Sequence, residues 1–298
     1  MKIKKLIGSK NNKMLEKFEI KGVTSKTIDP KKYTSIFKEF GVVVFRDFFS
    51  NDPDFNDYYN DIKKLALIIA KKCNIKIDSS LLLNEILTIL SKSNRDEVGN
   101  LYDLGTRPIK LLSGLKLKTN PAVISFIKAI MGEDAVLGFP YLGETLHIFP
   151  PGKENTKYNL PMHQDYPYIM QSPDQITAYF NLGELQKENN GGIRVWAGSH
   201  SEGISPSTKS VTNHRITSNH THFENKYKSY DISFGIGDFA IFDSLIQHEG
   251  IQNHSDCTRV VQLIRYSNLM NSKSISYSWK STDPSAGRGI KFEDVHSF

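Results

Sequence analysis

The spacing of apolar residues divides the chain into a helix-rich first part and a strand-rich second part. Asp29 and Pro30 predict a helix start, and the short β-branched run in "GVVVFRDFF" from Gly41 predicts a strand. Apolar side chains at helical spacing predict helices over residues 54–72, 79–93 and 120–132.

After residue 134, short apolar runs alternate with Gly, Asn, Ser and Pro, as in "QITAYFNLG", "GGIRVWAG" and "TRVVQLIRYS". Many short strands at such intervals are typical of a sandwich or a jelly roll. Residues 201–232 are polar, and a segment of this length predicts a lid or a disordered insert. We expect one domain over residues 1–298. Its parts are a helix-rich part (about 1–133), a jelly-roll core (about 134–267) and a C-terminal tail (268–298).

Composition and charge narrow the functional classes. The chain has 298 residues, 39% of them hydrophobic, which suffices for a large core. The net charge is +6, but its lysines are densest at the N-terminus and no arginine-rich stripe is present. We therefore expect no specific nucleic-acid partner, and a surface with room for an anionic small-molecule substrate. Two cysteines without a CxxC, no secretory signal and no membrane-length apolar run predict a cytoplasmic protein without a membrane partner. The sequence does not indicate an oligomeric state.

The stretch "PMHQDYPY", residues 161–168, contains a candidate pair of metal ligands. In an extended strand His163 and Asp165 share one face, roughly 6.5–7 Å apart along the backbone, while Gln164 points away. An imidazole and a carboxylate can supply two ligands to a divalent metal. An isolated His-x-Asp is common by chance, however, and a loop histidine beside a capping aspartate is the better explanation of the pair taken alone.

A third ligand and an anion-binding residue come from the run that contains His248 and Arg259. A hairpin that turns symmetrically between Asn253 and His254 would pair position 248 with 259 and point both side chains into one cavity. Two histidines and a carboxylate leave three open positions on an octahedral iron, as in non-haem Fe(II) oxygenases. A buried arginine suits the far carboxylate of a dicarboxylate such as 2-oxoglutarate.

Four stretches give the chain a more specific resemblance. In order and spacing they resemble the phytanoyl-CoA dioxygenase family of Fe(II)/2-oxoglutarate-dependent oxygenases, over about residues 39–266. The stretches are residues 39–50, 147–165, 188–200 and 237–259. The resemblance implies a mainly β fold, with a cupin-like double-stranded β-helix (jelly roll) core and N-terminal helices packed on it.

The resemblance also implies a site. His163, Asp165 and His248 become the iron ligands, Arg259 the anchor of 2-oxoglutarate, and Thr145 and Tyr179 cosubstrate-pocket residues. With Fe(II), 2-oxoglutarate and O2, such a site hydroxylates an unactivated C–H of a small molecule and releases succinate and CO2. Related iron halogenases have a small residue at the carboxylate position, so Asp165 favours hydroxylation. Ala197 stands where the family usually has proline, which affects a loop.

Several residues near these motifs have two interpretations each. The tyrosines that flank the His-x-Asp pair can form the mouth of the site or pack in the core, and an arginine on the strand expected in "GGIRVWAG" can contact substrate. These are Tyr158, Tyr166, Tyr168 and Arg194. Arg265 is interpreted as a member of a structural ion pair, His200 as a partner of a loop carbonyl, and His222 as exposed.

Two other functional classes remain open. A cupin-like protein that binds zinc or manganese without redox chemistry would need the metal ligands but not Arg259. A catalytically silent binding module would keep the fold, and loss of a metal ligand would support it. None of His163, Asp165 and His248 is missing.

Overall fold

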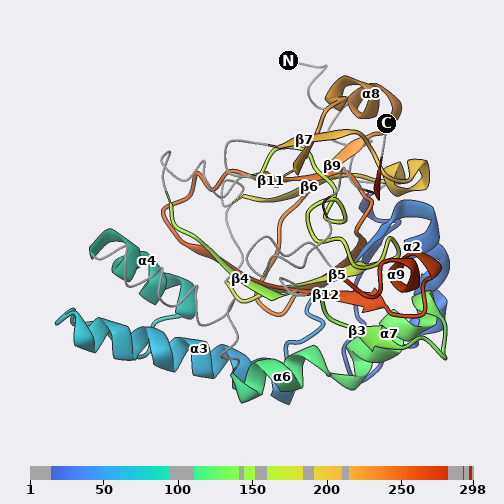
Figure 1. The fold of residues 1–298 in the computed structure, drawn as a ribbon. Helices are drawn as coiled ribbons and strands as arrows, with labels where there is room; N and C mark the ends of the chain where they lie inside the picture. The colour runs from blue at the N-terminus through green and yellow to red at the C-terminus, as the bar shows by residue number, and fades with distance from the viewer. Residues whose placement is uncertain are drawn as a thin grey trace.

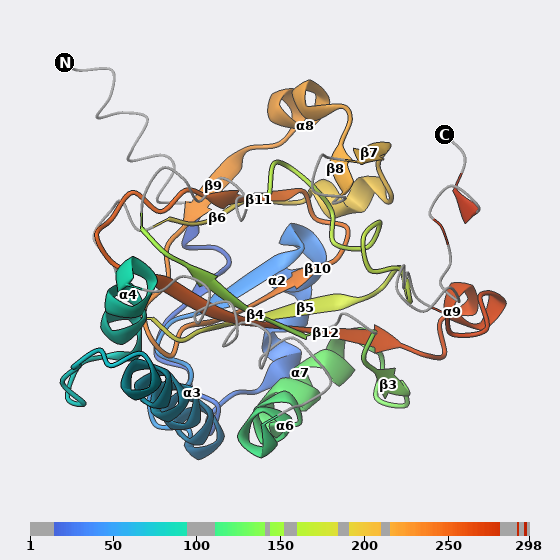
Figure 2. The same ribbon diagram turned by 60° about the vertical axis from the view of Figure 1, so that its left-hand side comes forward.

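The computed structural model describes residues 15–93, 111–140, 144–151, 160–183, 191–209, 215–280, 291 and 295–296. Within this part of the chain, two β-sheets lie face to face, and helices cover the outer face of the larger sheet (Figures 1 and 2). Helices and strands thus form three layers with an apolar core on each side of the larger sheet.

The larger sheet is organised around its long strand β12, with which three other strands pair. Every pair in this sheet is antiparallel except β1 with β2. The strand order is β1 (Glu19–Ile20), β2 (Val42–Phe45), β10 (Phe239–Asp243), β5 (Ile176–Asn181) and β12 (Arg259–Asn268), followed by β4 (Glu144–Phe149) and β3 (Leu137–Gly138), which both pair with β12.

The smaller sheet has the order β11 (His248–Ile251), β6 (Gly192–Trp196) and β9 (Ser229–Ile232). A separate hairpin consists of β7 (Ser207–Lys209) and β8 (Arg215–Thr217). The two facing sheets form a double-stranded β-helix, the cupin-like jelly roll. The predicted fold class, mainly β with flanking helices, is confirmed.

Strand β2 shows how the sequence divides the core between the layers. All four of its residues are buried. Val42 and Val44 pack between the sheets, whereas Val43 and Phe45 pack against the helices, as period-two alternation requires. A strand that is buried on both faces reads as a continuous apolar run, which explains the sequence "VVVF".

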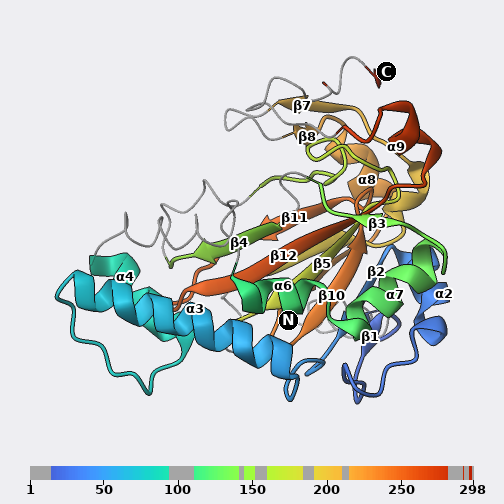
Figure 3. The same ribbon diagram turned by 60° about the horizontal axis from the view of Figure 1, so that its bottom comes forward.

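The outer face of the larger sheet is covered by helices, of which α3 (Pro53–Lys72) is the longest described (Figure 3). The Asp52 carboxylate caps this helix by accepting a hydrogen bond from Phe55 N at 3.1 Å, and Pro53 occupies its first turn. Its buried positions recur at helical spacing: Phe55, Tyr58, Ile62, Ala66 and Ala70.

The other described helices are η1 (Pro30–Tyr33), α2 (Thr34–Phe40), α4 (Leu83–Ser93), α6 (Leu112–Lys118), α7 (Pro121–Met131), η3 (Ser199–Glu202), α8 (His220–Lys226) and α9 (Ser272–Ser276). The helix that begins near Pro30 and helices α4 and α7 agree with predicted segments to within a few residues, whereas α6, η3, α8 and α9 were not predicted. The first begins as a 3-10 turn, and Asp29 makes no side-chain cap hydrogen bond there. No described helix is both long and apolar enough to cross a membrane.

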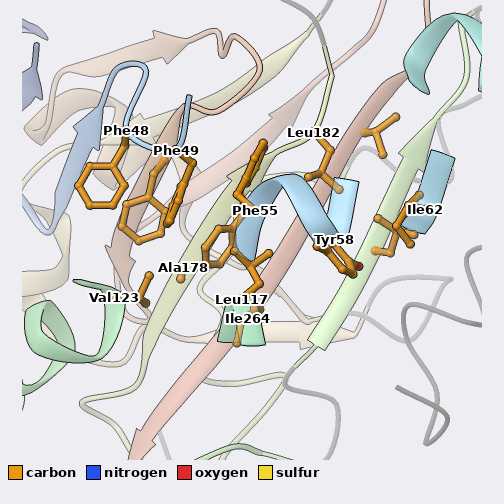
Figure 4. Packing of buried hydrophobic residues seen from close by; sticks show 14 of the residues in the cluster. Phe48, Phe49, Phe55, Tyr58, Ile62, Leu117, Val123, Ala178, Leu182 and Ile264 are labelled. Carbon is orange, nitrogen blue, oxygen red and sulfur yellow. The ribbon is translucent and has the colours of Figure 1, made fainter. Parts of the chain in front are cut away.

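An aromatic cluster joins the helices to the larger sheet (Figure 4). The Phe49 ring stacks on Phe55 at a centroid distance of 5.5 Å and lies 5.4 Å from Phe180 and 5.3 Å from Phe239. Phe49 therefore contacts helix α3 and strands β5 and β10 at once, and it is fully buried.

Two expectations from the sequence are wrong. Strands β11 and β12 do not form a hairpin, because they belong to different sheets: His248 pairs with Val195 and Arg259 with Phe149. The described residues of 201–232 are not a disordered insert. They form β7, β8, α8 and β9, and β9 completes the smaller sheet.

We expect Phe49→Ala to lower the free energy of unfolding by about 3–5 kcal/mol, because a large ring is removed from a site with no room to collapse. Chemical denaturation measures this loss. Leu112→Ala is the matched control, since Leu112 is 77% exposed and its truncation should cost less than about 0.5 kcal/mol. Equal losses in the two variants would contradict the assignment of this cluster as the core.

Candidate metal centre

Two histidines from distant parts of the chain are joined through their backbones. His163 N donates to His248 O at 2.9 Å, and His248 N donates to His163 O at 3.0 Å. This isolated antiparallel bridge brings the two imidazole centroids to 4.2 Å. His248 also shares the inner face of the smaller sheet with Val195 and lies 5.0 Å from the Phe242 ring of the larger sheet. The two side chains therefore lie between the sheets.

Both imidazoles have the tautomer that a metal ligand needs. His163 Nδ1 lies 2.8 Å from Pro161 O, and His248 Nδ1 lies 3.1 Å from Ile246 O. A carbonyl oxygen only accepts, so each Nδ1 carries the hydrogen and the lone pair is on Nε2. Burial lowers the pKa of His248, against the opposing attraction of Asp165, which favours its neutral form.

Asp165 completes a compact group with the two histidines. Its Oδ1 lies 4.0 Å from Nε2 of His163 and 4.0 Å from Nε2 of His248. All three side chains are buried, and their ligand atoms lie within 4.8 Å of one another. Gln164 points away from the group, as predicted, and its amide bonds Gly203 O, Leu245 O and Ser205 N.

The Asp165 carboxylate is held by two residues from the larger sheet. Arg265 donates to both carboxylate oxygens at 3.1 Å, and Thr177 Oγ1 donates to Oδ2 at 2.6 Å. Burial works to raise the pKa of Asp165, but the charge of Arg265, helped by the two histidines, holds that pKa well below its usual range. The ion pair predicted for Arg265 is confirmed. Thr177 was missed, although it alternates with Tyr179 in "QITAYFN" and so shares its face.

Arg259 lies on the same inner face as this group. It is six residues before Arg265 on β12, and its Nη1 donates to Gly192 O at 2.6 Å and Ile251 O at 3.4 Å. Its guanidinium carbon lies 4.0 Å from the centre of the Phe149 ring. Within the described part of the chain no carboxylate pairs with Arg259, and its buried Nε has no hydrogen-bond partner.

Tyr179 and Thr145 lie on the inner face of the larger sheet, between Arg259 and the His-Asp-His group. Both are paired with Leu263 of β12, one from each side, so the three side chains form a row across the larger sheet. Burial raises the pKa of Tyr179 to about 12, so its hydroxyl stays protonated. That hydroxyl is buried and makes no hydrogen bond to any described residue. Two buried donors, Arg259 Nε and Tyr179 Oη, therefore lack an acceptor.

A buried His-Asp-His group and a buried arginine without an anion call for comparison with known proteins. The family model "Phytanoyl-CoA dioxygenase (PhyH)" matches residues 37–261. The chain belongs to the phytanoyl-CoA dioxygenase family. It is therefore an Fe(II)/2-oxoglutarate-dependent oxygenase, and the cofactors predicted from the sequence, Fe(II), 2-oxoglutarate and O2, are those of the family. A search of curated proteins finds no match.

Solved structures share the fold of this phytanoyl-CoA dioxygenase family member at low sequence identity. The epimerase SnoN in complex with Fe3+, alpha ketoglutarate and nogalamycin RO is 12% identical, with a TM-score of 0.55, over 87% of this chain and 91% of that one. The carbocyclase SnoK is 13% identical, with a TM-score of 0.53, over 82% and 86%. EctD from S. alaskensis with bound Fe is 14% identical, with a TM-score of 0.52, over 80% and 77%.

In this family member, the residues suggested for substrate contact lie in different places. Tyr168 is partly exposed, and its electrostatic partners are Arg265 and Asp165, which places it beside the His-Asp-His group. Tyr166 is fully buried and packs with Met170 in a small apolar cluster, so it is a packing residue. Tyr158 lies outside the described residues.

Arg194 is not brought to the group. It pairs directly with Glu249, one position after His248, so it lies on the outer face of the smaller sheet. There Arg194 Nε and Nη2 bond the Asp231 carboxylate at 2.5 and 2.8 Å, and Nη1 bonds Glu249 at 3.0 Å. Its charge is matched by these two carboxylates.

Two further histidines lie outside the group. His200 Nε2 lies 3.1 Å from Lys38 O in the last turn of helix α2, so its partner is a helix carbonyl and not the expected loop carbonyl. His222 is exposed and lies 2.8 Å from a carboxylate oxygen of Glu202.

A buried polar network supports the two segments that carry the three candidate ligands. Ser205 N donates to Gln164 Oε1 at 2.9 Å, and Ser205 Oγ accepts from Gln247 Nε2 at 2.8 Å. Thr217 Oγ1 donates to Gln247 Oε1 at 2.6 Å. Gln164 separates His163 from Asp165, and Gln247 precedes His248, so Ser205 and Thr217 of the segment 201–232 help to hold both ligand-bearing stretches in place.

Gly191, immediately before β6, leaves room for the Arg259 side chain. Gly191 has φ +79°, and a Cβ there would lie 2.5 Å from Ile251 O and 3.0 Å from Arg259 Nη1. A side chain at position 191 would therefore meet both Arg259 and the carbonyl to which it donates. This contact explains why the chain carries a glycine at this position.

Proposed function

We propose that this enzyme hydroxylates an unactivated C–H bond of a small-molecule substrate while 2-oxoglutarate is converted to succinate and CO2. His163, Asp165 and His248 would hold Fe(II), since two neutral imidazoles and a carboxylate are its usual ligand set in this chemistry. Bound iron supplies the activation of O2 that is coupled to oxidation of the cosubstrate. The protein positions the substrate and the cosubstrate and excludes water from the site.

The observation that carries the proposal is Arg259, a buried cation for which the described part of the chain supplies no anion. Arg259 Nη1 reaches Ile251, three residues after His248 on β11, so the guanidinium lies about 10 Å along that strand from the candidate ligand. Burial lowers the pKa of Arg259, but a guanidinium stays charged. A buried charge without a partner is costly, and a carboxylate ligand would remove that cost.

Tyr179 and Arg259 would bind the far carboxylate of 2-oxoglutarate together. Each offers a buried N–H or O–H without an acceptor among the described residues. A carboxylate that accepts from both would gain charge-assisted hydrogen bonds and fix the direction of the cosubstrate. The keto-acid end of 2-oxoglutarate would then face His163, Asp165 and His248. Thr145, which lies in the same row of side chains as Tyr179, would lie beside the cosubstrate.

Apolar side chains would keep water from the reacting atoms. Val42, Val44, Ile193, Val195 and Phe242 are buried between the sheets around the inner face that carries His248. Expulsion of water strengthens the electrostatic interactions inside such a site and suppresses side reactions.

A small organic molecule is the proposed substrate. The structures of SnoN and EctD include nogalamycin RO and 5-hydroxyectoine respectively, both small molecules. The earlier expectation of an anionic substrate rested partly on Arg194, which Asp231 and Glu249 already neutralise. We therefore propose no charge for the substrate.

A metal-binding cupin without redox chemistry is the second candidate. It would use the same three ligands, but it would have no use for a buried arginine that lacks a carboxylate. Arg259 therefore favours the 2-oxoglutarate-dependent reaction over this candidate and over a silent binding module.

Without oxygen, Fe(II) and 2-oxoglutarate should give the visible charge-transfer band of the metal chelate with the wild-type protein. Arg259→Gln should raise the 2-oxoglutarate concentration for half-saturation about ten- to a hundredfold, because charge-assisted hydrogen bonds are lost. Absorption titration measures both. His163→Ala should abolish the band.

Two surface variants are the matched controls for this titration. Arg194→Gln removes an arginine from the outer face, and His222→Ala removes an exposed histidine. Both should titrate as the wild type does. Absence of the band in metal-loaded wild-type protein at saturating 2-oxoglutarate would contradict the proposal.

Gly191→Ala should also weaken 2-oxoglutarate binding, by about tenfold or more, because the added Cβ displaces Arg259 Nη1 and strains a residue at positive φ. The same titration measures the change. Gly22→Ala is the control, since Gly22 has φ +72° but nothing lies within 4 Å of its added Cβ. Equal affinities in the two variants would mean that contact with Arg259 is unimportant.

The reaction outcome is tested once a substrate is found by screening for compounds that stimulate succinate formation. We expect the product to gain one oxygen atom that derives from labelled O2, as mass spectrometry can show. An isomerised or desaturated product without that oxygen would contradict hydroxylation while leaving the cofactor assignment intact.

A further inference from the structure

The two oxygens of Asp165 have different surroundings. Oδ2 accepts from Thr177 Oγ1 at 2.6 Å and from Arg265 Nε at 3.1 Å. Oδ1 accepts from Arg265 Nη2 at 3.1 Å and lies 4.0 Å from Nε2 of each histidine. A carboxylate oxygen has about two lone-pair positions. Both positions on Oδ2 are therefore used, whereas Oδ1 keeps one that faces the histidines.

The sheet register produces this arrangement. Thr177 of β5 and Arg265 of β12 are directly opposed cross-strand partners, so both side chains emerge on the same inner face. Thr177 is fully buried, Arg265 is 6% exposed and Asp165 is 3% exposed. Water cannot easily replace either donor, so the Oδ2 contacts are fixed by the fold.

We propose that Thr177 and Arg265 keep Oδ2 engaged, so that Asp165 binds the metal through Oδ1 alone and one coordination position stays open for O2. This inference rests on the proposed function. Two imidazoles and one carboxylate oxygen leave three of six positions on an octahedral metal. The keto acid of 2-oxoglutarate takes two of them, and one remains. A carboxylate that used both oxygens would fill the last position.

Thr177 and Arg265 are thus positioning residues that act through Asp165. An ordinary ion pair would need only a charge near the carboxylate. The threonine adds a second donor that is aimed at the one oxygen that must not bind the metal. Its removal frees a lone pair on Oδ2 without changing the charge or the shape of the site.

The test uses Thr177→Val, which replaces the hydroxyl by a methyl group. Fe(II) and 2-oxoglutarate are added without oxygen, and the charge-transfer band is titrated. Nitric oxide, a stand-in for O2, is then titrated and its complex followed by electron paramagnetic resonance. We expect the valine variant to form the band with near wild-type affinity but to bind nitric oxide at least about tenfold more weakly, since a blocked position must first be vacated.

Other variants make the result decisive. Thr177→Ser keeps the hydroxyl and should restore nitric oxide binding, whereas Thr88→Val removes a buried hydroxyl from helix α4 and should have no effect. Arg265→Lys keeps the charge but not the fork that spans both oxygens, so it should also weaken nitric oxide binding. If the valine variant does not fold, Arg265→Lys provides the test in its place.

The outcomes separate this inference from the proposed function. If Thr177→Val binds nitric oxide as strongly as the wild-type protein does, the inference is overturned. If Thr177→Val does not fold, nitric oxide binding of wild-type strength in Arg265→Lys overturns it instead. In both cases the charge-transfer band would still support the cofactor assignment. Failure of the wild-type protein to form the band would overturn the proposed function itself.

Discussion

The reciprocal backbone hydrogen bonds between His163 and His248 are the constraint on which the candidate site depends. They join an irregular stretch after β4 to the first residue of β11, and they place two imidazoles in contact. Closing the loop of chain between His163 and His248 costs conformational entropy, which the contacts of these two residues alone cannot offset. The closure is stabilised from both sides, by the apolar core between the sheets and by the network of Gln164, Ser205 and Gln247.

Local pattern was sufficient to predict much of this arrangement. Period-two alternation placed His163 and Asp165 on one face with Gln164 on the other, and the structure agrees. Helical spacing located α3, α4 and α7 because an amphipathic stripe reflects the core that it covers. The run "VVVF" predicted β2 because β-branched residues favour strands, and the structure shows that all four residues are buried. Each of these predictions depends only on neighbours along the chain.

The predictions that failed needed information about distant neighbours. A symmetrical turn made β11 and β12 a hairpin, but β11 pairs with β6 and β12 with β4 and β5. Alternation alone cannot tell which face of a strand points inward, so Arg194 was considered as a substrate contact although it lies on the outer face. The polar segment 201–232 misled for a related reason, because its serines and threonines satisfy buried glutamines behind the ligands. Likewise β1 and β2, from the helix-rich part, complete the larger sheet.

The position of Arg259 has a consequence for the cohesion of the whole fold. Its Cα belongs to the larger sheet, while its Nη1 donates to backbone carbonyls of β6 and β11 in the smaller one. A ligand that satisfies its remaining donors would therefore tie the two layers together as it binds. Occupancy and stability are then thermodynamically linked, because any species that binds only the folded form shifts the folding equilibrium. The amides of β6 and β11 would be the ones whose hydrogen exchange slows most as the cosubstrate is taken up.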